Sequence, residues 1–200
     1  MKRLGLNLLT LALLFSLLPS IAFAMEWQID PAHTNVQFSV RHMMISNVRG
    51  DFNKVSGTVT SDGQNPDALK IDAVIDAGSI DTRIEKRDQH LKSADFLNVE
   101  KYPTIEFKSK KVGANGTGKW KVTGDLTLHG VTKEVVLDVE GPTAEIKDPI
   151  GNTRVGASAT TKINRKDFGL TWNKVLETGA VMVGDEVEIT IDVEAVQKQS

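Results

Sequence analysis

Apolar and polar residues alternate along most of the chain beyond residue 24. The pattern is clearest in residues 186–195, where Val187, Ile189 and Ile191 are separated by glutamate, threonine and aspartate. A strict period of two places successive side chains on opposite faces of a β-strand, so that one face is dry and the other is wet. The alternation therefore predicts strands rather than helices.

Seven further segments show the same alternation. The residues expected to share one face are Val36, Phe38, Val40 and His42; Val55, Gly57 and Val59; Leu69, Ile71, Ala73 and Ile75; Ile105 and Phe107; Trp120, Val122, Leu126 and Leu128; Val135, Leu137 and Val139; and Val155, Ala157, Ala159, Thr161 and Ile163. Turn-forming pairs separate these segments, namely Asp62-Gly63, Asn115-Gly116, His129-Gly130, Gly141-Pro142 and Gly151-Asn152. Such hairpin-length spacing indicates a largely antiparallel meander.

About eight such strands can close into a barrel with room for one small ligand. A sandwich of two sheets would show the same alternation, so the pattern leaves both architectures open. Composition agrees with β-structure, because residues 25–200 contain 20 Val, 12 Ile and 16 Thr but only 8 Leu. β-Branched side chains suit a pleated, half-buried surface better than a helix. The sequence thus predicts an all-β domain.

One stretch, residues 81–98, departs from the alternation and spaces its apolar residues irregularly among charges. We predict a short helix over Arg83–Leu91, capped by Ser79 or Asp81, with Glu85 in its first turns. This segment would be a crossover that covers one end of the barrel. Because the chain has no linker, repeat or low-complexity run, residues 25–200 are expected to form one domain.

The first 24 residues have the pattern of a secretory signal peptide. Lys2 and Arg3 precede an apolar run over Leu4–Leu18, and Ala22-Phe23-Ala24 provides a small-x-small cleavage site. The apolar run is shorter than the roughly 20 residues that cross a bilayer. We therefore expect residues 1–24 to be a cleaved signal peptide, and residues 25–200 to be a soluble periplasmic protein.

Charge and cysteine content exclude several classes of function. The full chain has 24 basic and 26 acidic residues, and without Lys2 and Arg3 the balance is −4, which makes nucleic acid an unexpected partner. The absence of cysteine excludes disulfides, thiolate metal sites and cysteine nucleophiles. The stability of an exported protein without disulfides has to come from its core.

Catalytic signatures are missing, and the sequence contains no nucleophile elbow, zinc-protease motif, P-loop or dinucleotide-binding motif. The four histidines lack the short spacing of a local chelate, so a metal site would require tertiary convergence. His129 fits a turn and His33 fits the start of a strand. His42 shares the face of Phe38 and Val40, so it should point into the interior, either as a hydrogen-bonded core residue or as a ligand contact. We expect no catalytic residue, no metal site and no cofactor.

Several spaced motifs resemble the YceI-like family over about residues 26–194. They are Trp27–Thr34, Phe38–His42, Ser79–Thr82, Arg87–Leu91, Asp95-Phe96, Tyr102–Phe107, Gly124–Thr132, Asn164–Leu170 and Val183–Val187. The resemblance implies an extended, lipocalin-like antiparallel barrel of eight strands that holds a long amphiphile. It also implies a polyisoprenoid or an isoprenoid quinone as the ligand and a binding protein rather than an enzyme.

Alternation assigns the ligand-binding lining to the inward-facing side chains, and the loop around residues 167–172 adds two aromatic residues that would pack in the core or form a lid. The predicted ligand-binding residues are Phe38, His42, Ile75, Phe107, Leu126, Leu128, Leu137, Phe168 and Trp172. Two alternatives remain open at this point. One is a quinone-linked enzyme or redox partner in which His42 or His90 handles protons, and the other is a stress-related structural barrel without a ligand. The partners considered are the isoprenoid lipid, a membrane or a membrane cytochrome, and a second copy of the chain.

Overall fold

The computed structural model describes residues 25–62, 68–177 and 179–198. Residues 1–24 and Gly63 lie outside these ranges, and with them the predicted signal peptide and half of the predicted Asp62-Gly63 turn. The elements are β1 (Met25–Ile29), β2 (Asn35–His42), β3 (Ser46–Phe52), β4 (Val55–Ser61), β5 (Lys70–Asp76), η2 (Ala77–Ser79), β6 (Ile80–Asp81), α1 (Glu85–Lys92), β7 (Thr104–Ala114), β8 (Lys119–Leu128), β9 (Val131–Glu140), β10 (Ile146–Lys147), β11 (Thr153–Asn164), η3 (Arg165–Phe168) and β12 (Val183–Gln197).

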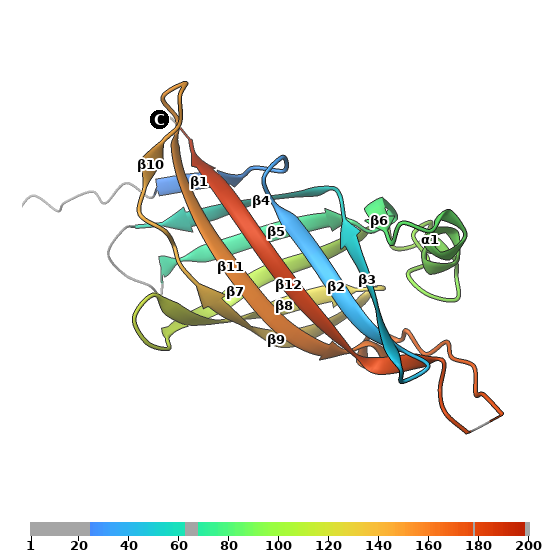
Figure 1. Ribbon diagram of the computed structural model, residues 1–200. Helices are drawn as coiled ribbons and strands as arrows, with labels where there is room; N and C mark the ends of the chain where they lie inside the picture. Colours follow the sequence, from blue (N-terminus) through green and yellow to red (C-terminus); the bar gives the residue numbers. More distant parts are fainter. Residues whose placement is uncertain (1–24, 63–67, 178, 199–200) are drawn as a thin grey trace, which may run out of the picture.

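The strands form a closed antiparallel barrel, so the barrel prediction is confirmed and the sandwich is wrong (Figure 1). Strand β12 closes the ring because it pairs with β11 along one edge and with both β1 and β2 along the other. The next positions are filled by β4 beside β1 and β3 beside β2, followed by β5, β7, β8 and β9. Pairing of β9 with β11 completes eight positions around the barrel.

A bulge in β7 keeps its apolar residues facing the interior. The pairing of β7 with β8 shifts register between Ser109 and Lys111, where an extra residue is inserted. Phe107 before the bulge and Val112 after it, five residues apart, therefore both face inward. On β8, Gly124 lies between the inward positions of Val122 and Leu126, and a Cβ atom there would meet the Phe107 ring at 2.5 Å. Glycine is required because the aromatic ring fills that space.

The β8–β9 hairpin confirms the predicted turn at His129-Gly130. Both residues have positive φ, 53° and 74°, as a two-residue turn matched to the strand twist requires. The Tyr102 ring lies against Gly130, where a Cβ atom would approach it to 2.4 Å. His129 also hydrogen-bonds through Nδ1 to the carbonyl of Phe168 at 3.2 Å, so this turn is tied to η3.

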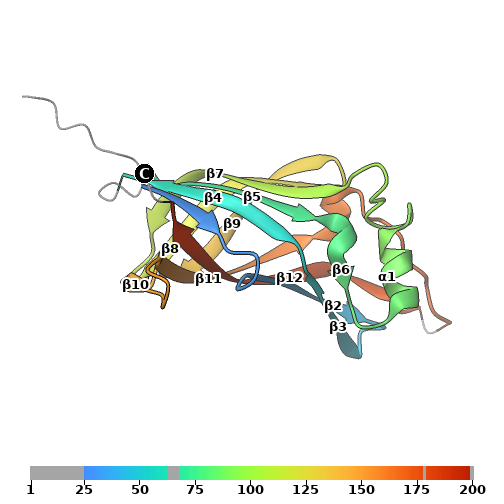
Figure 2. The same cartoon turned by 90° about the horizontal axis from the view of Figure 1, so that it is seen from above.

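The crossover contains α1 at one end of the barrel, as the irregular stretch predicted (Figure 2). The predicted cap is wrong, because Ile84 occupies the N-cap position and makes no side-chain hydrogen bond there. Asp81 instead accepts from the backbone N–H of Arg83, whose positive φ of 66° separates the turn from the helix. Ser79 donates to the carbonyl of Asp76. The helix thus begins at residue 85 rather than at residue 83.

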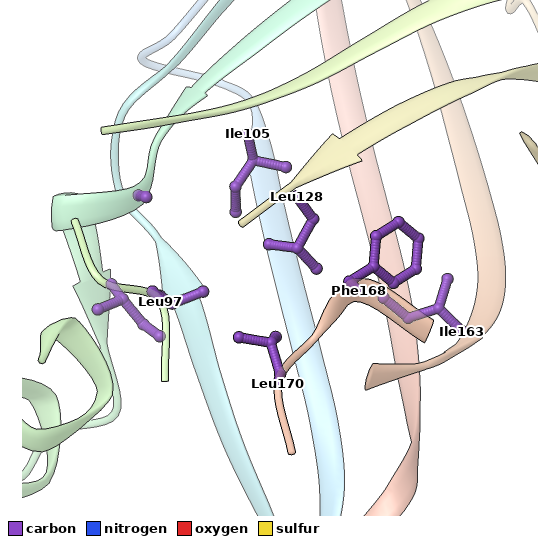
Figure 3. Packing of buried hydrophobic residues seen from close by; sticks show 8 residues of the cluster. Leu97, Ile105, Leu128, Ile163, Phe168 and Leu170 are labelled. Atoms are coloured by element: carbon purple, nitrogen blue, oxygen red, sulfur yellow. The ribbon is translucent and has the colours of Figure 1, made fainter. Parts of the chain in front are cut away.

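Two clusters of buried side chains form the core. One closes the barrel end next to α1 and includes Ile105, Leu128 and Phe168, with Leu97 contributed by the loop after α1 (Figure 3). The other lies in the barrel wall and is built around Val112, Val122 and Leu137. In the described ranges, no helix is long and apolar enough to cross a membrane.

Candidate ligand-binding cavity

A cavity of about 720 Å³ runs along the inside of the barrel. Its lining is almost entirely apolar and consists of the inward-facing residues of every long strand. Six of the nine predicted ligand-binding residues lie in this lining, namely Phe38, Ile75, Phe107, Leu126, Leu128 and Leu137. A volume of this size falls in the range of 300–1,000 Å³ that small-molecule sites occupy. The barrel is therefore hollow enough to hold a ligand.

The other three predicted residues lie away from this lining. His42 is the last residue of β2, where it pairs with Val183 and Ser46, and it does not line the cavity. Phe168 is 2% exposed within the cluster that closes the barrel end. Trp172 packs against other rings outside the cavity. That these three residues contact a ligand stays a prediction, and the geometry of the cavity does not support it.

Trp172 belongs to a cluster of three aromatic rings that joins two loops to α1. Its ring lies 5.0 Å from those of His90 and Phe96, measured between centroids. His90 in turn hydrogen-bonds through Nε2 to Asp95 at 2.8 Å. The aromatic contacts and the bond to Asp95 thus occupy the ring and one nitrogen of His90. Neither His42 nor His90 lines the cavity, so the geometry gives no support to proton transfer by a histidine to an enclosed ligand.

Sequence reasoning missed part of the lining. Trp27 and Ile29 on β1 are 6% and 5% exposed and line the cavity, although the strand is only five residues long. Their alternation with Met25 was a usable signal in a short segment. Val112 was missed because strict alternation from Phe107 would turn it outward, whereas the extra residue in the β7 bulge turns it inward.

The floor of the cavity, beside the end cluster, contains the buried guanidinium of Arg165. Its donors bond to the carbonyls of Gly184 and Trp172 at 2.9 Å, and also to that of Leu170. The remaining amino group lies 3.4 Å from both the Val183 carbonyl and Asp185 Oδ1. Burial lowers the pKa of Arg165 and the charge of Asp185 opposes that shift. With its donors engaged, Arg165 holds the loops together rather than offering a site to a ligand.

The opposite end of the cavity reaches the surface beneath residues 141–145, which we call the strap. Among the described lining residues, the exposed ones are Pro142, Thr143 and Glu145, all in the strap. Trp120 Nε1 donates to the Gly141 carbonyl at 2.7 Å, and the Thr143 N–H donates to the Gly156 carbonyl at 2.8 Å. The strap is thus fastened to β8 and β11, and it marks the open end of the barrel.

Few of the described lining residues are polar, and several of these are already bonded to the protein. Thr34 Oγ1 accepts from the backbone N–H of Glu194, and Thr161 Oγ1 donates to the Val136 carbonyl at 2.8 Å. Gln37 donates to Asp51 at 3.2 Å. A ligand in the interior therefore meets hydrocarbon, and its polar groups find solvent at the strap.

Arg154 joins three carboxylates where β1, β11 and β12 meet near the β10–β11 hairpin. It donates to Asp148 at 2.8 Å, to Asp30 at 2.6 Å and to Glu194 at 2.5 Å. This guanidinium lowers the pKa of Asp148 to about 2 and, together with His33, holds the pKa of Asp30 well below its usual range. The hydrogen bond from His33 Nδ1 to Asp30, 2.9 Å, agrees with the predicted role of His33 at the start of a strand.

Asp30, His33 and Glu194 also form, in the described part of the chain, a group of three potential metal ligands whose ligand atoms lie within 4.8 Å of one another. Arg154 bonds to both carboxylates and supplies a positive charge at the position that a cation would need. A metal ion there would face electrostatic repulsion, so the arrangement is explained by the ion pairs alone.

The fold and the cavity define a class of protein: a closed antiparallel barrel with a continuous apolar interior, one closed end and one open end. The sequence matches the YceI-like domain family model over residues 27–195, and the chain belongs to that family. A UPF0312 protein of Staphylococcus aureus strain N315 is 39% identical over 170 residues, which cover 84% of this chain and 96% of that protein.

Solved structures show the same fold. The Campylobacter jejuni YceI protein is 34% identical and superposes with a TM-score of 0.67 over 80% of this chain and 90% of that one. A domain from Saccharophagus degradans, described as a polyisoprenoid binding domain implicated in plant cell wall breakdown, superposes with a TM-score of 0.63 at 16% identity, covering 86% and 98% of the two chains. The family resemblance predicted from the sequence motifs is confirmed.

Proposed function

We propose that this protein binds and carries a long-chain isoprenoid amphiphile, either a polyisoprenoid or an isoprenoid quinone. The observation that carries the proposal is the apolar cavity of about 720 Å³ that runs along the barrel. Each CH₂ group removed from water stabilises the complex by about 0.8 kcal/mol, so a chain of many such groups gains a large free energy by entering. The polyisoprenoid-binding domain of the same fold gives independent support for this ligand class.

The cavity favours one orientation of the ligand. The hydrocarbon chain lies in the interior, where the lining is almost entirely apolar. The headgroup lies at the strap, where Thr143 and Glu145 are exposed to water. Burying an unpaired polar headgroup at the closed end would cost free energy, because no free donor remains on Arg165. Binding, rather than catalysis, is the activity that this arrangement supports.

We further propose that the protein acts in the periplasm after export. The support is the sequence of the first 24 residues, with Lys2 and Arg3 before an apolar run and Ala22-Phe23-Ala24 at its end. Amino-terminal sequencing of the soluble periplasmic fraction should give a chain that begins at Met25. A soluble periplasmic chain that still begins at Met1, or its absence from that fraction, would contradict this proposal.

The ligand can be identified by purifying the protein natively from the exported compartment and extracting it with organic solvent. Mass analysis of the extract should find a prenyl-chain lipid in near-stoichiometric amount. The variant Leu126→Asp, purified in the same way, serves as the control because it places a charge in the cavity lining. An extract without any long-chain amphiphile, or with equal amounts from both proteins, would contradict the proposal.

A further inference from the structure

The β10–β11 hairpin, residues 146–153, projects two large apolar side chains into solvent next to the open end of the cavity. Ile150 is 83% exposed and Ile146 is 62% exposed. The strap leads directly into this hairpin, so the two isoleucines follow the lining residue Glu145 in the chain. Exposed isoleucines cost free energy in water, and here two of them lie on one hairpin beside the opening of the cavity.

The hairpin is held rigidly at its base. Asp148 accepts from the backbone N–H groups of Ile150 and Asn152 at 3.0 and 2.9 Å, and its other oxygen accepts from Arg154 at 2.8 Å. Arg154 is in turn bonded to carboxylates on β12 and at the end of β1. The isoleucines are therefore fixed in their outward position, and docking through them requires little further ordering.

The charges of the hairpin suit a phospholipid surface. Lys147 is exposed, and its ammonium group donates to the Thr153 hydroxyl at 3.3 Å and pairs with no carboxylate of the described residues, so its charge is available to a phosphate group. The carboxylate of Asp148 is paired with Arg154, whose single positive charge is shared with Asp30 and Glu194.

The geometry points to a lipid bilayer as the occupant of this surface: we propose that the protein docks on membranes through Ile146 and Ile150, with Lys147 on the headgroups, so that the open end of the cavity faces the bilayer. The inference rests on the proposed function, because a bilayer is where an isoprenoid lipid is dissolved. A protein partner fits less well. A stable protein interface buries roughly 800 Å² on each side, far more than two isoleucines on one narrow hairpin provide.

The described chain offers a matched control at the other end of the barrel. Ile45 in the β2–β3 turn is 75% exposed and Val175 in the loop before β12 is 69% exposed, so this pair is as apolar and as accessible as the hairpin pair. Figure 1 shows the β2–β3 turn and that loop at the end of the barrel opposite β10. The variants I146S/I150S and I45S/V175S therefore remove similar apolar surface from opposite ends.

Flotation with vesicles tests the proposal. The vesicles contain two parts phosphatidylcholine and one part phosphatidylglycerol, without any isoprenoid lipid, so that docking is measured separately from cargo binding. Parent protein and I45S/V175S should float equally, whereas the affinity of I146S/I150S for the vesicles should fall about tenfold or more. Parent protein that stays unbound, equal flotation of all three proteins, or an equal loss in I45S/V175S would overturn the proposal.

A second measurement separates this proposal from the proposed function. The upward shift in melting temperature caused by an added prenyl lipid should be the same in parent, I146S/I150S and I45S/V175S, because none of these substitutions touches the cavity lining. If the parent protein binds vesicles but shows no shift with prenyl lipid, the carrier function fails while the docking surface stands. If I146S/I150S loses self-association rather than vesicle binding, the surface is an interface between copies and the docking proposal is wrong.

Discussion

At the scale of single residues, Arg154 connects three separate segments of the chain. Its guanidinium bonds to carboxylates on the β10–β11 turn, at the end of β1 and on β12, and these three segments are far apart in the sequence. A charge-assisted hydrogen bond is stronger than a neutral one, and three of them on one guanidinium fix the relative positions of the segments. The same bonds raise the pKa of Arg154 itself.

These ion pairs predict a dependence of stability on pH. Asp30 and Asp148 have lower pKa values when folded than when unfolded, so the unfolded state binds more protons in acid. Their contribution to the free energy of unfolding is complete above about pH 4 and is lost as the pH falls toward about 2, the folded pKa of Asp148. Urea unfolding at a series of pH values should therefore show a steep loss of stability over this interval.

The substitution Arg154→Gln is expected to lower stability at neutral pH and to flatten the acid dependence, because Asp30 and Asp148 then lose the cation that lowers their pKa values most. Lys121→Gln is the control, because it removes an exposed pair with Asp138 and should change the free energy of unfolding by less than about 0.5 kcal/mol. An Arg154→Gln variant with the same slope as the parent between pH 4 and 2 would show that the network has no part in acid stability.

Arg165 gives a second prediction at this scale. It is 3% exposed and donates to backbone carbonyls of the loops around η3 and the start of β12. Arg165→Met should lower the free energy of unfolding by about 3–5 kcal/mol, because several buried carbonyls lose their donor. The neighbouring change Lys166→Ala removes an exposed side chain and should cost about 0.5 kcal/mol or less. Denaturant unfolding of both variants measures the difference, and equal midpoints would contradict the assignment.

At the scale of strands, alternation decides which side chains face the cavity. Phe107 on β7 and Leu126 on β8 are paired in register and both line the interior, whereas Lys108 and Thr127 are one position away on the outer face. Phe107→Asp and Leu126→Asp should abolish prenyl-lipid binding or unfold the domain, because each buries an unpaired charge. Lys108→Ala and Thr127→Ala should change the melting temperature and the affinity very little. Equal effects from the two pairs would mean that the register is wrong.

The strands were predictable because their period of two is a local property of the sequence. The eight alternating segments and the turn at His129-Gly130 were all placed correctly. The predictions failed where a long-range feature intervened. The bulge in β7, which turns Val112 inward, depends on the pairing with β8, and the sequence of one strand does not encode it.

The helix and the loop aromatics show the same limit. The irregular stretch indicated a helix, but Arg83 adopts a positive φ that separates Asp81 from the helix it was predicted to cap. Phe168 and Trp172 were predicted to line the cavity because they are large and flank a glycine. The structure places Phe168 in the closing cluster and Trp172 against His90 and Phe96. Their size and apolar character alone could not show whether they line the cavity or pack in the cluster that closes the barrel end.

At the scale of the whole molecule, the barrel has two different ends. One end is closed by the cluster around Phe168 and Leu128, with the loop after α1 packed against it. The other end opens beneath the strap, which is the part of the lining that solvent reaches. A long chain therefore has one direction of entry, and the apolar interior of the barrel shields it from water along its length.

The central claim is that the cavity holds a long prenyl chain, and thermal unfolding of delipidated protein tests it most directly. A ligand that binds the folded state alone stabilises it by about 2.7 kcal/mol at a hundredfold excess over Kd, which corresponds to a rise in melting temperature of roughly 5–10 °C for a domain of this size. The rise should be nearly independent of salt, because screening acts on charges and not on buried hydrocarbon. Delipidated and lipid-loaded protein that melt at the same temperature would contradict the account.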